Sequence, residues 1–172
     1  MALEELRLLN AADCSAFRAI RAEGLAVSPS AFGESEAEFS RSTDEQVIHR
    51  FAGEQSRCAG YLLDGKLCGV AVLSRMWGEK SAHRGLIWGV YVQPQLRGKG
   101  VATKLMERVI QEVPTYRNPA LRHLFLKVAR GNAPAIALYK GLGFVECGVE
   151  PEALLINDSY VDEILMIRAF SE

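Results

Sequence analysis

The segment Trp88-Gly89-Val90-Tyr91-Val92-Gln93-Pro94-Gln95-Leu96-Arg97-Gly98-Lys99-Gly100-Val101-Ala102-Thr103 connects three sequence patterns without a break. Its first half is rich in aromatic and β-branched residues, which favours a strand, and Pro94 ends that strand. Gly98-Lys99-Gly100 then opens a helix whose apolar stripe includes Val101 and Leu105. Free N–H groups at a helix start, together with the helix dipole, favour a negatively charged group there. The segment therefore predicts a strand, a glycine-rich turn and a helix arranged around an anion.

The composition of the turn indicates a binding site for a pyrophosphate group. Gly98 and Gly100 carry no side chain that would block the close approach of a phosphate, and Arg97 and Lys99 add positive charge. The spacing is not that of a P-loop, which needs G-x-x-x-x-G-K-[ST]. A dinucleotide fingerprint would need a glycine in place of Thr103. A pyrophosphate site of another type is predicted, and a tight turn without a ligand is the alternative.

The segments on either side predict a mixed α/β sheet with helices on its faces, in the approximate order β-α-α-β-β-β-α-β-α-β-β. Asp64-Gly65 is typical of a two-residue hairpin turn. Strands are expected over Leu3–Leu9, Cys58–Leu63, Lys66–Leu73, Gly85–Gln93, Leu121–Val128, Phe144–Val149 and Tyr160–Ala169. Helices are expected from Asn10 to about Gly24, from about Glu34, after Thr43-Asp44, from Gly100 until Pro114 stops it, and from Asn132 to Tyr139.

Composition excludes several classes of protein. The 172 residues favour one domain, covering 1–172. Twenty Lys and Arg against 21 Asp and Glu give a net charge of −1, which argues against nucleic-acid binding. No apolar run approaches the ~20 residues that span a bilayer, and the first residues show no signal-peptide pattern. A cytoplasmic protein without membrane contact is expected. The four cysteines form no C-x-x-C pair, so no metal site is expected.

Two blocks of sequence resemble one enzyme family. Arg97-Gly98-Lys99-Gly100-Val101-Ala102 resembles the R-x-x-G-x-[GA] motif of the GNAT superfamily of acetyl-CoA-dependent N-acetyltransferases. The segment from Asn132 to Phe144 is similar to the family's N-x-x-A-x-x-x-Y-x-x-x-G-F pattern. The loop 28–33 and the strand 160–166 are also similar to parts of many members. The resemblance covers nearly the whole chain, and both blocks at this separation are more specific than either one alone.

The resemblance implies the fold and the donor. The fold would be α/β (α+β), with a mixed, mostly antiparallel sheet of about seven strands, helices on both faces, and central strands that splay at the cofactor cleft. Acetyl-CoA would be the co-substrate, with Arg97 shaping the loop that binds it. Backbone N–H groups binding its pyrophosphate would come from Gly98, Lys99, Gly100, Val101, Ala102 and Thr103.

The resemblance also implies how the pantetheine arm is held. Val90 and Val92 would pair with the arm like a neighbouring strand, and one of their N–H groups would polarise the thioester carbonyl. Such a donor typically contributes ~3 kcal/mol. Asn132 is similar to a residue that contacts pantetheine in the family. Its position fits a plain helix N-cap equally well, and both roles are compatible.

Tyr139 matches the tyrosine that protonates the departing thiolate in many relatives. The alternative is a tyrosine that only packs against the cofactor. The cofactor motif holds no cysteine to carry the acetyl group, so direct attack in a ternary complex is expected. Phe32 and Trp88 are the expected walls of the acceptor pocket, with ordinary core packing as the alternative.

The general base remains open. Many relatives carry a glutamate on the strand occupied here by 86–89, which has none, so a water relay or a base from a loop is favoured. Each available group is expected mainly to be a solvated surface charge. The groups considered are Glu34, Glu36, Glu38, Glu79, His83, Asp162 and Glu163.

The expected function is transfer of an acetyl group from acetyl-CoA to a primary amine. The alternatives are an acyl-CoA-binding sensor without turnover, or a transferase that uses a longer acyl chain. The acceptor is expected to be a small-molecule or peptide amine, which the sequence does not specify. Relatives are often dimers, so a homodimer is possible.

Overall fold

A computed structural model describes residues 2–170, and the predicted domain 1–172 extends beyond this part at both ends. Within residues 2–170 the strands form one seven-stranded sheet in the order β1-β2-β3-β4-β5-β7-β6. Only β4 and β5 run parallel to each other among these neighbours. The strands are β1 (Glu4–Leu8), β2 (Ser56–Leu63), β3 (Lys66–Arg75), β4 (Arg84–Val92), β5 (His123–Ala129), β6 (Val145–Ile156) and β7 (Ser159–Ala169).

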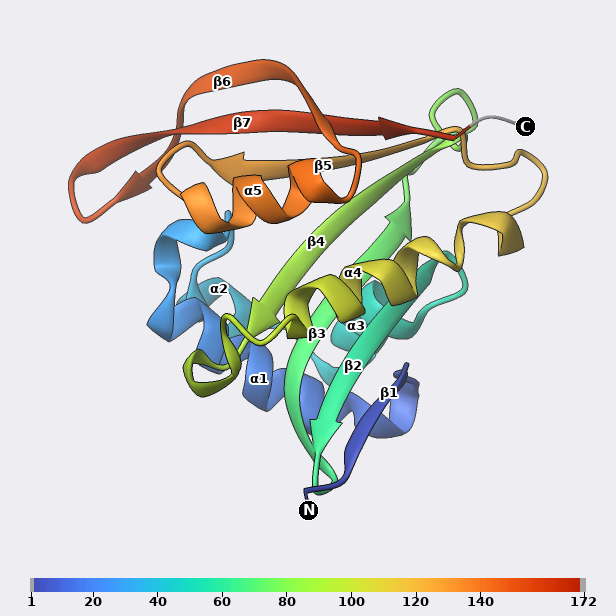
Figure 1. Ribbon diagram of the computed structural model, residues 1–172, viewed down its shortest axis with the longest axis vertical. Helices are drawn as coiled ribbons and strands as arrows, with labels where there is room; N and C mark the ends of the chain where they lie inside the picture. The colour runs from blue at the N-terminus through green and yellow to red at the C-terminus, as the bar shows by residue number, and fades with distance from the viewer. Residues whose placement is uncertain (1, 171–172) are drawn as a thin grey trace.

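Helices cover both faces of the sheet, as predicted (Figure 1). The helices are α1 (Cys14–Val27), α2 (Glu36–Ser40), α3 (Asp44–Ala52), α4 (Val101–Ile110) and α5 (Ala133–Gly141). Short 3₁₀ helices cover Ala11–Asp13, Pro29–Ala31, Pro94–Leu96 and Val113–Thr115. One core lies between the sheet and α1–α3, where Phe17 stacks on Phe51 with ring centroids 4.2 Å apart. The other lies under α4 and α5, around Leu105 and Met106.

The three helices expected before β2 are all present, although the approximate order counted only two of them. Two expectations about where helices end were wrong. Helix α1 does not end at Gly24 but continues to Val27. Gly24 is buried, and a Cβ there would lie 3.1 Å from the Tyr91 ring, so this glycine permits close packing rather than ending the helix. Helix α4 ends at Ile110, and Pro114 lies in the following 3₁₀ turn.

Strand β6 is much longer than predicted because a proline does not stop it. The expected strand ended at Val149, but β6 continues to Ile156 through Pro151, with an irregularity in its pairing to β7 between Glu150 and Leu154. It is the outer strand of the sheet. Proline is tolerated on an outer strand, because its missing N–H faces away from the neighbouring strand.

The sheet opens in its middle, as the family resemblance implies. Strands β4 and β5 pair only through three residues of each, from Arg84↔His123 to Leu86↔Phe125. Beyond them the two strands diverge (Figure 1). The β3–β4 register also shifts where Gly89, with φ of +65°, lies opposite Ala71. This is the geometry of a bulge that begins with a left-handed glycine, and such bulges bend a strand.

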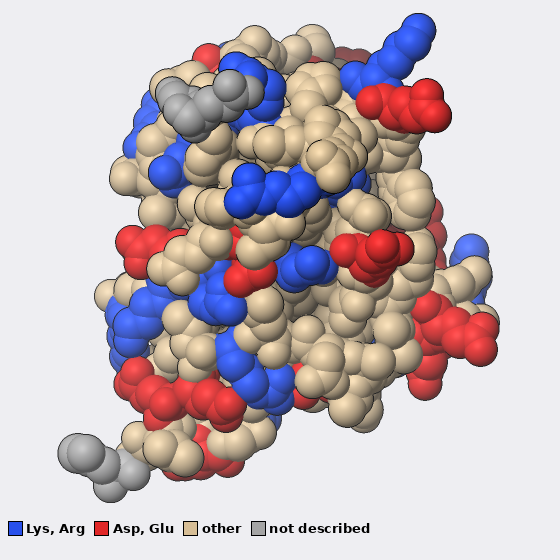
Figure 2. All heavy atoms as spheres, turned by 90° about the vertical axis from the view of Figure 1, so that its right-hand side faces the viewer, with Lys and Arg blue, Asp and Glu red and all other residues tan. Residues whose placement is uncertain are grey.

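The surface carries charges of both signs. Figure 2 shows one face, on which Lys and Arg side chains are interspersed with Asp and Glu side chains. The residues drawn in colour on that face form no extended basic band. No helix within residues 2–170 is long and apolar enough to cross a membrane.

Candidate functional site

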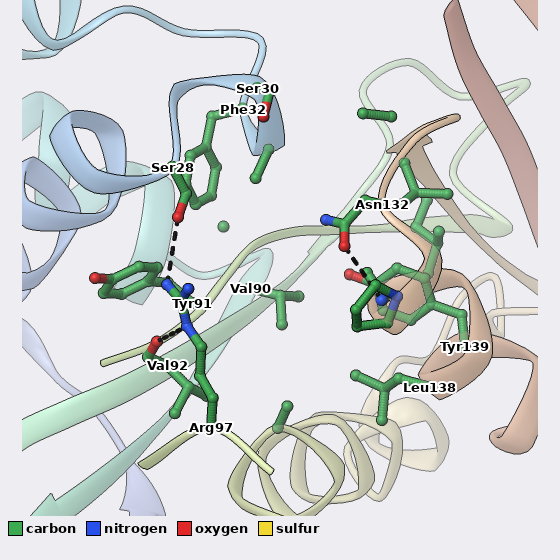
Figure 3. Close-up of a pocket in the computed structure, with 18 of the residues that line it drawn as sticks. Ser28, Ser30, Phe32, Val90, Tyr91, Val92, Arg97, Asn132, Leu138 and Tyr139 are labelled. Carbon is green, nitrogen blue, oxygen red and sulfur yellow. Dashed lines mark hydrogen bonds between the residues drawn. The ribbon is translucent and has the colours of Figure 1, made fainter. Parts of the chain in front are cut away.

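A cavity of about 940 Å³ lies where β4 leaves β5. In Figure 3, Ser28, Phe32 and Arg97 lie on one side, Asn132 and Tyr139 on the other, and Val90 between them. The predicted site residues line this one cavity with the exception of Lys99. Those lining it are Phe32, Trp88, Val90, Val92, Arg97, Gly98, Gly100, Val101, Ala102, Thr103, Asn132 and Tyr139. Residues more than a hundred positions apart in the sequence, such as Phe32 and Tyr139, therefore meet in one cavity.

The N-terminus of α4 presents unpaired donors to the cavity. Gly100 precedes the helix with φ of +77°, and Gly98 has φ of +73°, a region that side chains strongly disfavour. No side chain caps α4, whereas α2, α3 and α5 each have a side-chain cap. The first intrahelical hydrogen bond is that of the Lys104 N–H to the Gly100 carbonyl, at 3.1 Å. The N–H groups before it are available to an anion.

Arg97 binds protein atoms rather than pointing freely into the cavity. Its Nε donates to the Val92 carbonyl at 3.0 Å, and its Nη2 donates to Ser28 Oγ at 3.3 Å. Its guanidinium also lies over the Tyr91 ring. The side chain therefore connects the glycine loop to the end of β4 and to the loop after α1. The role of Arg97 in shaping a loop that binds the cofactor stays a prediction.

The exposed edge of β4 forms the centre of the cavity. Val90 and Val92 both lie beyond Leu86, where pairing to β5 ends. Alternate backbone N–H and C=O groups of an unpaired strand edge are free to bond an extended ligand. The cavity continues along this edge from the α4 N-terminus to Trp88.

Helix α5 contributes two predicted residues. Asn132 caps the helix, because its Oδ1 accepts the Ala135 N–H at 3.3 Å, so the N-cap role is confirmed. A contact with pantetheine stays a prediction. Tyr139 is 7% exposed and lines the cavity. Burial raises the pKa of its hydroxyl to about 12, so Tyr139 keeps its proton at neutral pH.

At the other end, Phe32 and Trp88 line the cavity and are also packed against protein. Phe32 is buried and lies beside Tyr91. The Trp88 Nε1 donates to Ser74 Oγ at 2.9 Å. Core packing therefore holds for both side chains, while their role as walls of the acceptor pocket stays a prediction.

Behind these aromatic rings lies an ion cluster that the sequence did not reveal, here called the Arg21–Glu34–Arg50 cluster. Glu34 accepts from Arg21 Nη2 at 3.1 Å and from Arg50 Nη1 at 2.7 Å. Burial raises the pKa of Glu34, but hydrogen bonds and charge from Arg50 and Arg21 outweigh it, and the pKa lies below its ordinary value. A carboxylate held this way is a poor proton acceptor. The members lie on separate elements, and no local spacing relates them.

Three of the other carboxylates considered as a base also have structural partners. Glu38 bonds Ser35 in a capping box, and Asp162 bonds Arg130 at 2.9 Å. Glu163 lies 3.9 Å from Lys127, and burial raises the pKa of this glutamate. Lys127 lines the cavity and Glu163 does not. Within residues 2–170 no cluster of His, Cys, Asp or Glu is arranged to hold a metal ion.

Two curated relatives match part of the chain. A streptothricin acetyltransferase from Streptomyces lavendulae is 35% identical over 51% of this chain and 43% of that protein. A spermidine N(1)-acetyltransferase from Vibrio cholerae is 36% identical over 46% of this chain and 45% of that protein. The chain thus spans less than half the length of these two relatives.

A solved structure shares the fold over a greater part of this chain than the two curated relatives match. The structure of a putative acetyltransferase from Salmonella typhimurium with its cofactor acetyl-CoA superposes with a TM-score of 0.84 at 20% identity, covering 99% of this chain and 95% of that one. Residues 21–144 match the family described as "Acetyltransferase (GNAT) family". That match includes the glycine loop, the opened β4 edge and Tyr139, and the chain belongs to the GNAT acetyltransferase family.

Proposed function

We propose that this protein transfers an acetyl group from acetyl-CoA to a primary amine. The observation that carries the proposal is the uncapped N-terminus of α4, which opens into the cavity where β4 leaves β5. A helix start with free N–H groups suits the pyrophosphate of coenzyme A. The adjoining strand edge suits the amide groups of a pantetheine arm. Family membership supports the same donor.

The residues of the cavity fit such a donor in order along its length. No atom lies within 4 Å of the position that a Cβ on Gly98 or Gly100 would occupy, so the loop is open to a phosphate. Val90 and Val92 provide backbone next to it, and Tyr139 follows on α5. When bound, acetyl-CoA supplies an activated acetyl group as a thioester.

Two proton transfers are then required: one proton must reach the departing sulfur, and another must leave the attacking amine. Burial raises the pKa of Tyr139 to about 12, so its hydroxyl is protonated at neutral pH and would give its proton to the sulfur as the thiolate departs. An alkylamine with a pKa near ~10.4 must lose a proton before it attacks. Glu34 is already committed to Arg21 and Arg50. A water relay is therefore preferred to a direct carboxylate base.

Amine acceptors also agree with the relatives, one of which is named for spermidine. A sensor that binds acyl-CoA without turnover would need no acid at position 139. Tyr139 in the cavity with a retained proton favours turnover instead. A longer acyl donor stays a competing possibility and is tested by comparing thioesters.

The first experiment is calorimetric titration with acetyl-CoA, using NAD and ATP as controls. Saturable micromolar binding of acetyl-CoA alone is expected. Release of free thiol from acetyl-CoA is then followed with a panel of primary amines. Absence of binding by folded protein that is free of copurified CoA would refute the proposal. Binding without amine-dependent thiol release from any thioester would establish the sensor.

A further inference from the structure

Arg21 has hydrogen-bonding capacity that the described protein does not use. The residue lies on α1 and is only 5% exposed. Its Nη2 donates to Glu34 at 3.1 Å. Its Nε and Nη1 are buried and bond no protein atom within residues 2–170. A buried cation with unpaired donors destabilises a folded protein, and an apolar side chain at this position would avoid that cost. The unused donors therefore point to a ligand.

The unused donors lie next to the cavity. The Arg21 guanidinium is 4.5 Å from the Phe32 ring centroid and 5.7 Å from the Trp88 ring centroid. Nη1 is 3.7 Å from the position that a Cβ on Gly89 would occupy. Phe32, Trp88 and Gly89 all line the cavity. Arg21 itself does not line the cavity, and the Phe32 ring lies over its guanidinium, so binding of a ligand to Nη1 requires the Phe32 side chain to move.

The charge of the Arg21–Glu34–Arg50 cluster is unbalanced. Two guanidinium groups share one carboxylate, which leaves a formal charge of +1. Arg50 lies over the same indole as Arg21, 5.2 Å from the Trp88 ring centroid. Arg50 is partly exposed, but Arg21 is only 5% exposed, and a positive charge that water screens poorly attracts an anion and repels a second cation. A polyamine would be a poor match for this end of the cavity.

We propose that the acceptor amine carries a carboxylate, as in a free amino acid, and that Arg21 binds this carboxylate. The inference rests on the proposed function, because it identifies which amines enter. Arginine suits the role because its guanidinium stays charged and donates strong hydrogen bonds to carboxylates. A site with an unpaired buried donor also rejects analogues that lack the partner group.

The test compares each L-amino acid with its own carboxamide as acceptor. The amide removes the negative charge and keeps the side chain. Because the two amines differ in pKa, rates are compared per fraction of free amine. We expect kcat/KM to be at least about tenfold higher for the acid than for the amide. Equal values, or a preference for the amide, would overturn the inference and leave the proposed function standing.

Arg21→Met and Arg21→Lys test the residue itself. Arg21→Met is expected to abolish the preference for the acid, mainly through KM, and Arg21→Lys to retain part of it. The matched control is Arg18→Met, on the same helix, where the guanidinium lies over Phe39 and bonds the Ser42 carbonyl. This control is expected to keep the full preference. Thermal unfolding of each variant verifies the fold. An unchanged preference in both Arg21 variants would overturn the inference.

A binding experiment separates this inference from the proposed function. N-acetyl amino acids and their carboxamides are titrated into the protein saturated with CoA. We expect tighter binding of the acid, and loss of the difference in Arg21→Met. If no amine is acetylated but this difference is present, the proposed function fails and the carboxylate site stands. If acid and amide bind equally, the carboxylate site fails.

Discussion

The two ends of the cavity are built in different ways. The end proposed for the donor, called the donor end, is made of backbone from one continuous stretch, the edge of β4 and the start of α4. The end proposed for the acceptor, called the acceptor end, is lined by side chains of β4 and of the loop after α1, with the Arg21–Glu34–Arg50 cluster behind them. Backbone donors hold a ligand whatever side chains surround them, whereas side chains select by charge and shape. Under the proposed function, this difference makes donor binding depend on backbone and acceptor binding depend on side chains.

Tyr139 lines the same cavity. Tyr139→Phe is expected to have the largest effect on kcat. Removing a general acid lowers kcat by ~10²-fold or more, while acetyl-CoA affinity stays the same. Tyr116→Phe is the matched control, since burial also raises the pKa of Tyr116 to about 12. The Tyr116 hydroxyl bonds the Gln55 carbonyl at 3.3 Å, so this variant loses stability and keeps its kcat. Equal loss of kcat in both variants would assign Tyr139 a structural role.

Gly100→Ala tests whether backbone alone forms the donor end. Placing a side chain at φ of +77° costs about 1 kcal/mol, and the added methyl group meets the incoming phosphate. We expect acetyl-CoA affinity to fall at least about tenfold by calorimetry. Gly65→Ala is the control, because Gly65 has φ of +76° in the β2–β3 turn with the same open surroundings. Both variants should lose similar stability; if both also lost affinity, the effect would be global strain.

Arg97→Met tests whether binding at the donor end and binding at the acceptor end are coupled. Arg97 bonds both Val92 in the donor end and Ser28 in the acceptor loop. Each hydrogen bond is worth ~1 kcal/mol, so the variant should weaken acetyl-CoA binding and raise acceptor KM by about fivefold each. Ser28→Ala removes only the second bond and should raise acceptor KM alone. If Ser28→Ala also weakened donor binding, the two ends would not be separable.

The smallest expected effect concerns stability in acid. The folded-state pKa of Glu34 lies below its ordinary value because Arg50 and Arg21 outweigh the effect of burial. Glu34 therefore contributes stability above its unfolded pKa of ~4.3, and that contribution is lost as pH falls through the folded value. Urea unfolding of the wild type should lose more stability than Glu34→Gln below about pH 4.3, by less than ~1 kcal/mol. Parallel profiles for the two proteins would contradict this.

The sequence predicted the donor end because its residues are neighbours in the chain. Strand, glycine turn and helix start lie within Trp88–Thr103, and the second block at Asn132–Phe144 added the helix with Tyr139. Lys99 was predicted with this group but does not line the cavity. Its neighbours Gly98 and Gly100 do line it, since a turn directs consecutive residues to different sides. Local pattern assigns a loop to a site more reliably than it assigns each of its side chains.

Element ends depended on contacts that local pattern does not contain. Gly24 was interpreted as a helix end, yet it lies inside α1 because the Tyr91 ring needs the space of its missing side chain. Pro151 was expected to lie outside a strand, yet β6 accepts it because β6 is the outer strand. In both cases a segment distant in the sequence decided which secondary structure the residue adopts.

By itself, the sequence determined the mixed sheet, the donor loop and the helix that carries Tyr139, because hydrophobic periodicity, turn residues and helix-start donors act over a few neighbouring positions. Only the tertiary structure decided where β4 leaves β5, that Glu34 is held by two arginines, and that Arg21 lies behind Phe32 and Trp88 with two donors unpaired. These features depend on which distant side chains meet and which are deprived of water. Charge and burial are properties of the packed chain, and no spacing in the sequence specifies them.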